Sequence, residues 1–310
     1  MLNPESIMRR CLQLAANGLG RTRPNPLVGC VITDAQDRIL SEGYHQYHGG
    51  YHAERNAINL SPESSHQNLQ GATLFVNLEP CSHQGLTPPC ADLIVQSGIR
   101  RVVCCNDDPN PLVSGRGFAR LEAAGIEVVR HVLEEEGREL NRRFFTYMEQ
   151  QRPYVILKWA ESADGFMAPD YRPYWITTPQ QDRLSHRWRT EEAAILVGSQ
   201  TYLDDHPQLT PRHYLGPAPQ PVVWDRRHRI SDLPPHWLRL DGDTPQQALQ
   251  QLYEHHIQSV IIEGGRAVLD AFIAAGLYDE VRVLRNNTVL FHHGIPAPAI
   301  PPCSRTHIIL

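Results

Sequence analysis

Two cysteines in one polar loop are the residues of this sequence best suited to chemistry. Cys81 and Cys90 each follow a proline in NLEPCSHQGLTPPC, which spans residues 77–90. A thiol in a loop rich in Gly, Pro, Ser and Thr is a poor core residue, and disulfides are rare in a reducing cell. His52 and Glu54, in YHAERNAI, add an imidazole and a carboxylate. One His and two Cys form a ligand set that suits Zn²⁺.

The expected local structure favours a catalytic metal site. Cys90 begins a predicted helix, where backbone N–H groups and the helix dipole lower the pKa of a thiol. Three protein ligands leave a fourth position for water, whose pKa a zinc ion brings toward neutrality. Glu54 lies two residues after His52 at a helix start, so its side chain points in a different direction from that of His52. It is therefore free to transfer protons and need not bind the metal. This H-x-E and P-C pattern is typical of the zinc deaminases. His83 could supply a fourth ligand, which keeps a structural zinc site as an alternative.

Alternating strands and helices must position these residues. β-Branched runs predict strands at 27–34, 38–45, 72–80, 100–107 and 126–130. Helical patterns occupy the N-terminus up to Gly18 and the segments 52–60, 90–98 and 116–124. This rhythm predicts a three-layer α/β/α domain with its sheet between helices. A single charged helix is expected over 132–149.

The second half repeats the alternation as another α/β domain. Its predicted strands are YVILKWA, ILVG, PVVW, SVII and EVRVL, with a helix at AVLDAFIAAG. We place the boundary after the charged helix, which gives domains at 1–150 and 151–310. Gly264 and Gly265 stand between a buried strand and a helix, where glycines let the backbone approach a pyrophosphate. A tight turn alone would explain them equally well.

Composition and charge limit the class of protein. The chain has 310 residues and a formal net charge of −5, without a dense Lys/Arg block, so neither nucleic acid nor a membrane surface has electrostatic support as a partner. No apolar run approaches the roughly 20 residues that span a bilayer, and the amphipathic N-terminus is no signal peptide. Seven cysteines without framework spacing predict free thiols or metal ligands and a cytoplasmic protein. Core positions are expected for Cys11, Cys30, Cys104 and Cys105.

The first half resembles the deaminase domain of the RibD family of bifunctional riboflavin-biosynthesis proteins. The matching stretches are GRTRPNPLVGCVI, HAERNAI, LEPCSHQGLTPPC, DDPNPLVSGRG and AGIEV. The spacer of eight residues between the cysteines separates this family from cytidine deaminases, in which the spacer is shorter. The resemblance implies a cytidine-deaminase-like fold. It implies zinc ligands at His52, Cys81 and Cys90, a proton donor at Glu54 and a contact to the pyrimidine at Asn25.

Residues 153–280 resemble the reductase domain of the same family. The matching stretches are LKWAESADG, WITTPQQDRLSHRWRTEEAAILVGSQTYLDDHPQLTPR and SVIIEGGRAVLDAFIAAG. The resemblance implies a fold similar to dihydrofolate reductase and the cofactor NADPH. It implies cofactor contacts at Ala160, Trp175, Thr201, Asp205, Gly265, Arg266 and Ala267. It implies phosphosugar contacts at Arg189, Leu209, Arg212 and Glu263, and guanidinium groups suit phosphate because they bind it bidentately.

The whole resemblance implies a bifunctional enzyme with a small phosphorylated pyrimidine as substrate. Zinc-dependent hydrolysis would remove the amino group of a diaminopyrimidinone that carries a ribosylamino phosphate. NADPH would then reduce the ribosyl side chain to the ribityl side chain. A homodimer is expected only by analogy with the fold class.

Three departures from the family pattern leave alternatives open. Leu86 stands where the family often has Arg or Lys, and His206 where it usually has Asp or Asn. Only about forty-five residues follow Gly265 and their end is Pro-rich, whereas relatives continue with another strand pair. These features allow a monofunctional deaminase with an inactive, trimmed reductase domain, or a zinc-stabilised scaffold without activity. A nucleic-acid base deaminase would share the zinc chemistry.

Overall fold

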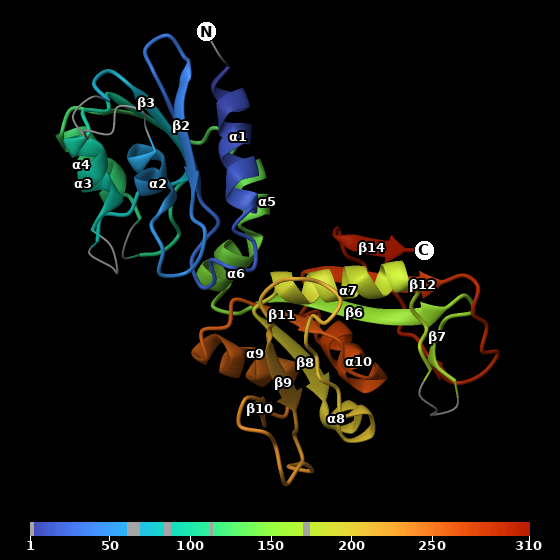
Figure 1. The fold of residues 1–310 in the computed structure, drawn as a ribbon. Coiled ribbons are helices and arrows are strands. Elements are labelled where there is room, and N and C mark those ends of the chain that lie inside the picture. The colour runs from blue at the N-terminus through green and yellow to red at the C-terminus, as the bar shows by residue number, and fades with distance from the viewer. Residues whose placement is uncertain (1–2, 61–68, 84–87, 112–113, 170–173) are drawn as a thin grey trace. The chain divides into compact units, whose positions relative to one another are not determined.

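The computed structural model describes residues 3–60, 69–83, 88–111, 114–169 and 174–310 (Figure 1). The chain divides into two units, Met1–Glu149 and Gln150–Leu310, and each is described by itself. Leu86 lies outside the described residues.

A five-stranded mixed sheet forms the centre of unit 1, in the order β2-β1-β3-β4-β5. Strand β1 (Gly29–Thr33) pairs antiparallel with β2 (Ile39–Tyr44) and with β3 (Thr73–Leu78). Strands β4 (Arg101–Asn106) and β5 (Glu127–Val129) continue the sheet in parallel. All five residues of β1 are buried, as expected for a strand covered on both faces.

Helices cover both faces of this sheet (Figure 1). On one face lie α1 (Pro4–Ala16) and α5 (Glu134–Leu140), and on the other α2 (Ala53–Asn59), α3 (Cys90–Gln96) and α4 (Arg116–Ala123). The predicted three-layer α/β/α fold is therefore confirmed. The four cysteines expected in the core have no exposed surface: Cys11, Cys30, Cys104 and Cys105.

The single charged helix expected over 132–149 is wrong. Two helices occupy this stretch, α5 and α6 (Arg142–Gln150), with Asn141 between them. The Asn141 side chain accepts a hydrogen bond from the Leu27 N–H at 2.8 Å and donates to the Leu27 carbonyl at 2.9 Å. This buried bridge to a distant segment fixes the interruption, and helical periodicity alone does not contain it.

A seven-stranded sheet forms the centre of unit 2, in the order β10-β9-β8-β11-β6-β12-β14. Every neighbouring pair is parallel. Its strands are β6 (Tyr154–Ser162), β8 (Ala194–Gly198), β9 (Gln220–Trp224), β10 (Leu238–Leu240), β11 (Ser259–Ile262), β12 (Glu280–Asn286) and β14 (Thr306–Ile309). A separate antiparallel pair joins β7 (Phe166–Ala168) to β13 (Ile295–Pro296).

Helices again pack on both faces of the sheet. One apolar cluster joins it to α7 (Pro179–Glu191) and α8 (Ser199–Asp205), and another joins its opposite face to α9 (Pro245–Glu254) and α10 (Arg266–Ala275). The α/β fold predicted for the second half is confirmed. Within the described part of the chain, no helix is both long and apolar enough to cross a membrane.

The sheet of unit 2 continues after α10, contrary to the idea of a trimmed domain. Strand β12 pairs with β6 over seven residues, and β14 adds a parallel edge strand to β12. The Pro-rich tail therefore leads back to the sheet, where its last β-branched residues pair with the edge of β12.

Candidate active sites

The predicted metal ligands of unit 1 converge from three places in the fold. His52 is the N-cap residue of α2, Cys81 follows β3, and Cys90 is the first residue of α3. The Nδ1 atom of His52 lies 3.6 Å from the Cys81 sulfur and 3.5 Å from the Cys90 sulfur. The backbone N–H of Cys90 donates to the Cys81 sulfur at 3.4 Å.

These separations fit a zinc ion. Tetrahedral bonds of about 2.3 Å to sulfur and about 2.0 Å to nitrogen would place S and N about 3.5 Å apart. One ligand atom from each of the three residues lies within 4.8 Å of the others. His83 is exposed and belongs to no such group among the described residues, which disfavours the four-ligand structural site. Three donors leave one coordination position open, as in catalytic zinc sites.

Close packing of α2 against β2 holds His52 in place. A Cβ atom at Gly43 would lie 2.4 Å from the Ala57 nitrogen and 2.6 Å from the Ala53 carbonyl oxygen. Only glycine lets the helix approach the strand this closely. A larger residue at position 43 would push the start of α2, and with it the imidazole, away from the cysteines.

The electrostatics of the site favour metal-binding forms. Hydrogen bonds from Cys90 and then His52 lower the pKa of the Cys81 thiol, although burial opposes them. The hydrogen bond to Cys81, followed by burial, raises the pKa of Cys90. The lowered thiol pKa expected at Cys90 is thus found at Cys81 instead. A metal would displace the thiol protons because thiolates are the ligands.

Glu54 is buried beside this donor set. It lies in the first turn of α2, two residues after His52, and is 3% exposed. Burial, above all, raises the pKa of Glu54. A carboxyl group with a raised pKa can both accept and release a proton near neutral pH.

Asn25 reaches the donor set through a histidine that the sequence analysis missed. Its Nδ2 atom lies 3.1 Å from Nε2 of His45, and Nδ1 of His45 lies 3.0 Å from the Tyr51 carbonyl oxygen. The rings of His45 and His52 meet edge to face with centroids 5.4 Å apart. His45 is the last residue of the predicted strand 38–45 and directly follows β2, and its place next to the ligands depends on how β2 faces α2.

Glu79 is a second residue that the sequence analysis missed. Its buried carboxylate accepts hydrogen bonds from the N–H groups of Asp108, Gly115 and Gly117, at 3.3, 3.0 and 2.9 Å. It thereby joins the loop that follows β3 to the loop before α4. The sequence signal for this role was an acidic residue at the end of a predicted strand, directly before P-C. A carboxylate buried there needs several hydrogen-bond donors.

In unit 2, the turns after β8 and β11 lie together. These parallel strands are neighbours, so their carboxyl ends share one edge of the sheet, where α/β proteins bind ligands. The Gly265 N–H donates to the Thr201 hydroxyl at 3.0 Å. A Cβ atom at Gly264 would lie 3.2 Å from the Gly198 nitrogen. No side chain caps the start of α10, which leaves backbone donors for a phosphate group.

A buried charge cluster joins two of the predicted substrate residues. Arg189 donates to both oxygens of Glu263, through Nε at 3.2 Å and a terminal nitrogen at 2.7 Å. The ammonium of Lys158 lies 3.5 Å from the same carboxylate. Burial raises the pKa of Glu263, but Arg189 and Lys158 outweigh it and lower that pKa to about 2. The sequence analysis missed Lys158, although LKWA places it on β6.

The other predicted residues of unit 2 lie in varied surroundings. Leu209 is buried, Arg212 is bonded to Gln208 at 3.1 Å, and Trp175 is exposed beside a pocket. Arg266 is engaged with Asp270 and the Pro296 carbonyl, each at 2.6–2.7 Å. Ala160 lies on β6, Ala267 in the first turn of α10 and Asp205 at the end of α8. His206 caps α8 with a positive φ of 42°.

Comparisons with known proteins agree with this architecture. The family "Cytidine and deoxycytidylate deaminase zinc-binding region" matches residues 1–106, and the family "RibD C-terminal domain" matches residues 153–290. The riboflavin biosynthesis protein RibD of Aquifex aeolicus is 38% identical over 309 residues, which cover 90% of this chain and 85% of that protein. RibD of Escherichia coli is 36% identical over 326 residues and covers 91% of this chain and 87% of its own length.

A solved structure matches both units together. It is the diaminohydroxyphosphoribosylaminopyrimidine deaminase/5-amino-6-(5-phosphoribosylamino)uracil reductase of Thermotoga maritima, with a TM-score of 0.85 and 38% identity. The match covers 96% of this chain and 93% of that chain. The fold and the zinc-binding region define a two-domain enzyme, a deaminase joined to a reductase. The chain belongs to the RibD family of riboflavin biosynthesis proteins. Zinc and NADPH, the cofactors expected from the sequence, are those of these two domains.

Proposed function

We propose that this chain deaminates a diaminopyrimidinone that carries a ribosylamino phosphate and then reduces its sugar side chain to the ribityl form. The observation that carries the first step is the convergence of His52, Cys81 and Cys90, with S–N separations of 3.5 and 3.6 Å, beside buried Glu54. The Thermotoga maritima relative is named for both activities. The seven-stranded sheet of unit 2 argues against a monofunctional deaminase with a trimmed second domain.

In the first step, the residues of unit 1 hold the metal and move protons. His52, Cys81 and Cys90 would hold zinc, which when bound supplies a Lewis acid that lowers the pKa of water toward neutrality. Glu54 accepts the proton of the attacking water and returns it to the amino group that leaves as ammonia. Asn25, held by His45, hydrogen-bonds the pyrimidine.

In the second step, the residues of unit 2 hold two phosphorylated molecules against each other. The open start of α10, Gly265 and Thr201 bind the phosphates of NADPH. Glu263 accepts hydrogen bonds from the sugar hydroxyls, and its orientation is fixed by Arg189 and Lys158. Arg212 binds the substrate phosphate. Hydride transfer then needs only correct positioning of the nicotinamide against the sugar carbon.

A two-stage assay tests both steps. Purified protein is incubated with the diaminopyrimidine ribosyl phosphate while ammonia is followed, and NADPH is added afterwards while its absorbance is followed. We expect ammonia first and NADPH oxidation second. Glu54→Ala should release no ammonia but should still oxidise NADPH when supplied with the deaminated substrate. Glu122→Ala, which changes an exposed glutamate of α4, is the matched control.

Each failure of the assay has a separate meaning. Ammonia without NADPH oxidation would leave a monofunctional deaminase, and no ammonia from zinc-loaded protein would leave the scaffold alternative. The absence of a nucleic-acid partner, the cytoplasmic location and a homodimer belong to the same proposal. Sedimentation of the purified chain measures the last of these.

A further inference from the structure

A second group of potential metal ligands lies in unit 2, on α7 and a following loop. Asp182 and His186 are four residues apart in α7, so they share one face of the helix. His213 comes from the loop between α8 and β9. One ligand atom from each of the three lies within 4.8 Å of the others. Among the described residues, this cluster and the His52 site are the two groups of this kind.

His186 is buried without adequate hydrogen-bond partners. The residue is 2% exposed, and its Nδ1 atom has no partner among the described residues. Its Nε2 atom lies 3.5 Å from Asp182 Oδ1, longer than a normal hydrogen bond. The ring nitrogen next to Asp182 is Nε2, so a metal ion between Nε2 and Oδ1 would give this buried imidazole a strong partner, whereas Nδ1 would stay unpaired.

The arrangement of the donors matches a metal site with nitrogen and oxygen ligands. The other carboxylate oxygen of Asp182 contacts Nδ1 of His213. The rings of His186 and His213 have centroids 4.7 Å apart, so both imidazoles adjoin the same carboxylate. Ligands at about 2.0 Å in a tetrahedral site are separated by about 3.3 Å, which is close to the 3.5 Å between His186 and Asp182. His213 is exposed and can adjust.

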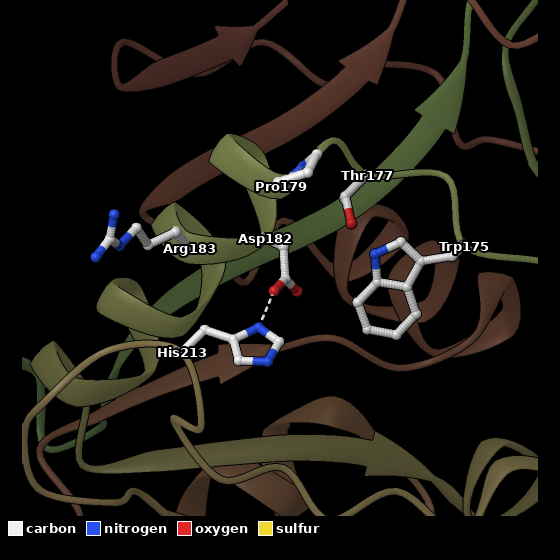
Figure 2. Close-up of a pocket in the computed structure, with 6 residues that line it drawn as sticks. All are labelled: Trp175, Thr177, Pro179, Asp182, Arg183 and His213. Atoms are coloured by element: carbon white, nitrogen blue, oxygen red, sulfur yellow. Dashed lines mark hydrogen bonds and ion pairs between the residues drawn. The ribbon is translucent and has the colours of Figure 1, made fainter.

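The cluster opens onto a pocket of about 580 Å³ (Figure 2). Its lining consists of Trp175, Thr177, Pro179, Asp182, Arg183 and His213. In Figure 2 the Asp182 carboxylate points toward His213, between that ring and Trp175, while Arg183 extends away from it. A metal ion here would have two imidazoles and one carboxylate on the protein side and open positions on the pocket side.

We propose that Asp182, His186 and His213 bind a divalent transition-metal ion, with zinc as the best match. Two histidines and one carboxylate with open positions are a ligand set of catalytic zinc and non-haem iron sites. The open positions would accept an oxyanion such as phosphate. Metal binding here does not depend on either step of the proposed function.

The charges around the cluster permit a cation. Arg189 and Arg212 are the guanidinium groups whose charges reach His186. The Arg189 guanidinium is itself bound by both oxygens of Glu263, which offsets its repulsion of a metal. The Asp182 carboxylate contributes the negative charge of the site.

Cobalt binding to the full chain tests the proposal, because Co²⁺ reports the ligand types at zinc sites. Metal-free protein is titrated with Co²⁺ in the presence of a competing chelator that suppresses weak surface binding. The thiolate site of unit 1 gives a near-ultraviolet charge-transfer band, whereas the Asp182 cluster gives only visible d–d bands. We expect two equivalents of bound cobalt, of which one lacks the thiolate band.

Variants decide which residues bind the second equivalent. His213→Ala and Asp182→Asn should each bind one equivalent and keep the thiolate band in full. His255→Ala, which removes an exposed histidine after α9, should still bind two. The proposal is overturned if wild-type protein binds one equivalent, or if His213→Ala and Asp182→Asn keep the second. Circular dichroism of both variants shows whether they remain folded, and His213 is exposed enough for this to be expected.

Discussion

The site residues of the two units differ in what satisfies their polar groups. In unit 1, an imidazole and two thiols face one another, with S–N separations of 3.5 and 3.6 Å. In unit 2, the Glu263 carboxylate is already bound by Arg189 at 2.7 Å and approached by Lys158 at 3.5 Å. Both sets are largely buried, yet only in the second is an anion already paired with cations.

This difference shows two ways of preparing a site. Thiol and imidazole ligands that converge without a counter-ion need a metal ion to bind them together. They contribute little to the stability of the fold until that ion binds. A buried carboxylate with two cations is held in place before any ligand arrives, and removal of one partner leaves uncompensated charge. Unit 1 should therefore lose mainly metal and activity on mutation, whereas unit 2 should lose stability.

The largest effect is expected from Cys81→Ser. Mutation of a residue that only hydrogen-bonds a metal ligand weakens metal binding by about 10–100-fold. Replacement of the ligand itself should therefore weaken zinc binding by more than about 100-fold. Ammonia release should fall with it. Zinc affinity is measured by chelator competition, with Cys303→Ser as the control because that cysteine is equally half-buried and lies in unit 2. Equal zinc affinity in the two variants would contradict the assignment of unit 1.

Glu263→Gln should destabilise unit 2 by about 3–5 kcal/mol, because Lys158 and Arg189 would remain buried without their anion. Denaturant unfolding measures this change. Glu254→Gln, at an exposed position of α9, should stay within about 0.5 kcal/mol of the wild type. If the two variants are equally stable, the cluster does not hold unit 2 together as the comparison requires.

Acid should weaken unit 2 through the same carboxylate. The pKa of Glu263 falls from 4.5 to about 2 on folding, so its contribution is complete above pH 4.5 and disappears as the pH falls toward 2. The shift corresponds to about 3 kcal/mol at most. Unfolding free energies across this range should show the loss in the wild type, and Glu263→Gln should lack this component. If the unfolding free energies of both proteins depend on pH in the same way, the acid effect comes from titratable groups other than Glu263.

The smallest effect is expected from Arg10→Ala in unit 1. Arg10 donates to both oxygens of Glu42 at 2.8 and 2.7 Å, a geometry as good as that of Arg189 with Glu263, but at the surface. Exposed pairs contribute about 0.2–1 kcal/mol and weaken in salt. Thermal unfolding at low and high salt measures both points. A loss of stability as large as that in Glu263→Gln would show that the geometry of an ion pair, and not its burial, sets its contribution to stability.

The candidate metal site of unit 1 could be predicted from the sequence because its signals are local. His52 and Glu54 are two residues apart, and the cysteines occur in one loop between a strand and a helix. The alternating strands and helices of both units were predicted for the same reason, since periodicity is a property of short segments. The interruption at Asn141 was not, because it rests on a hydrogen-bonded bridge to Leu27, 114 residues away.

The surroundings of the sites required the tertiary structure. Arg189 and Glu263 are 74 residues apart, and nothing in either motif shows that they bind each other. The same holds for His213, which joins Asp182 from 31 residues away, and for His45 beside His52.

The sequence by itself therefore determined which residues are the candidate zinc ligands, which elements carry them and to which family the chain belongs. Spacing within a loop or a helix is enough for those conclusions. Only the tertiary structure decided which charges neutralise one another, and which histidines share a carboxylate. Such contacts depend on how strands and helices distant in the chain pack together.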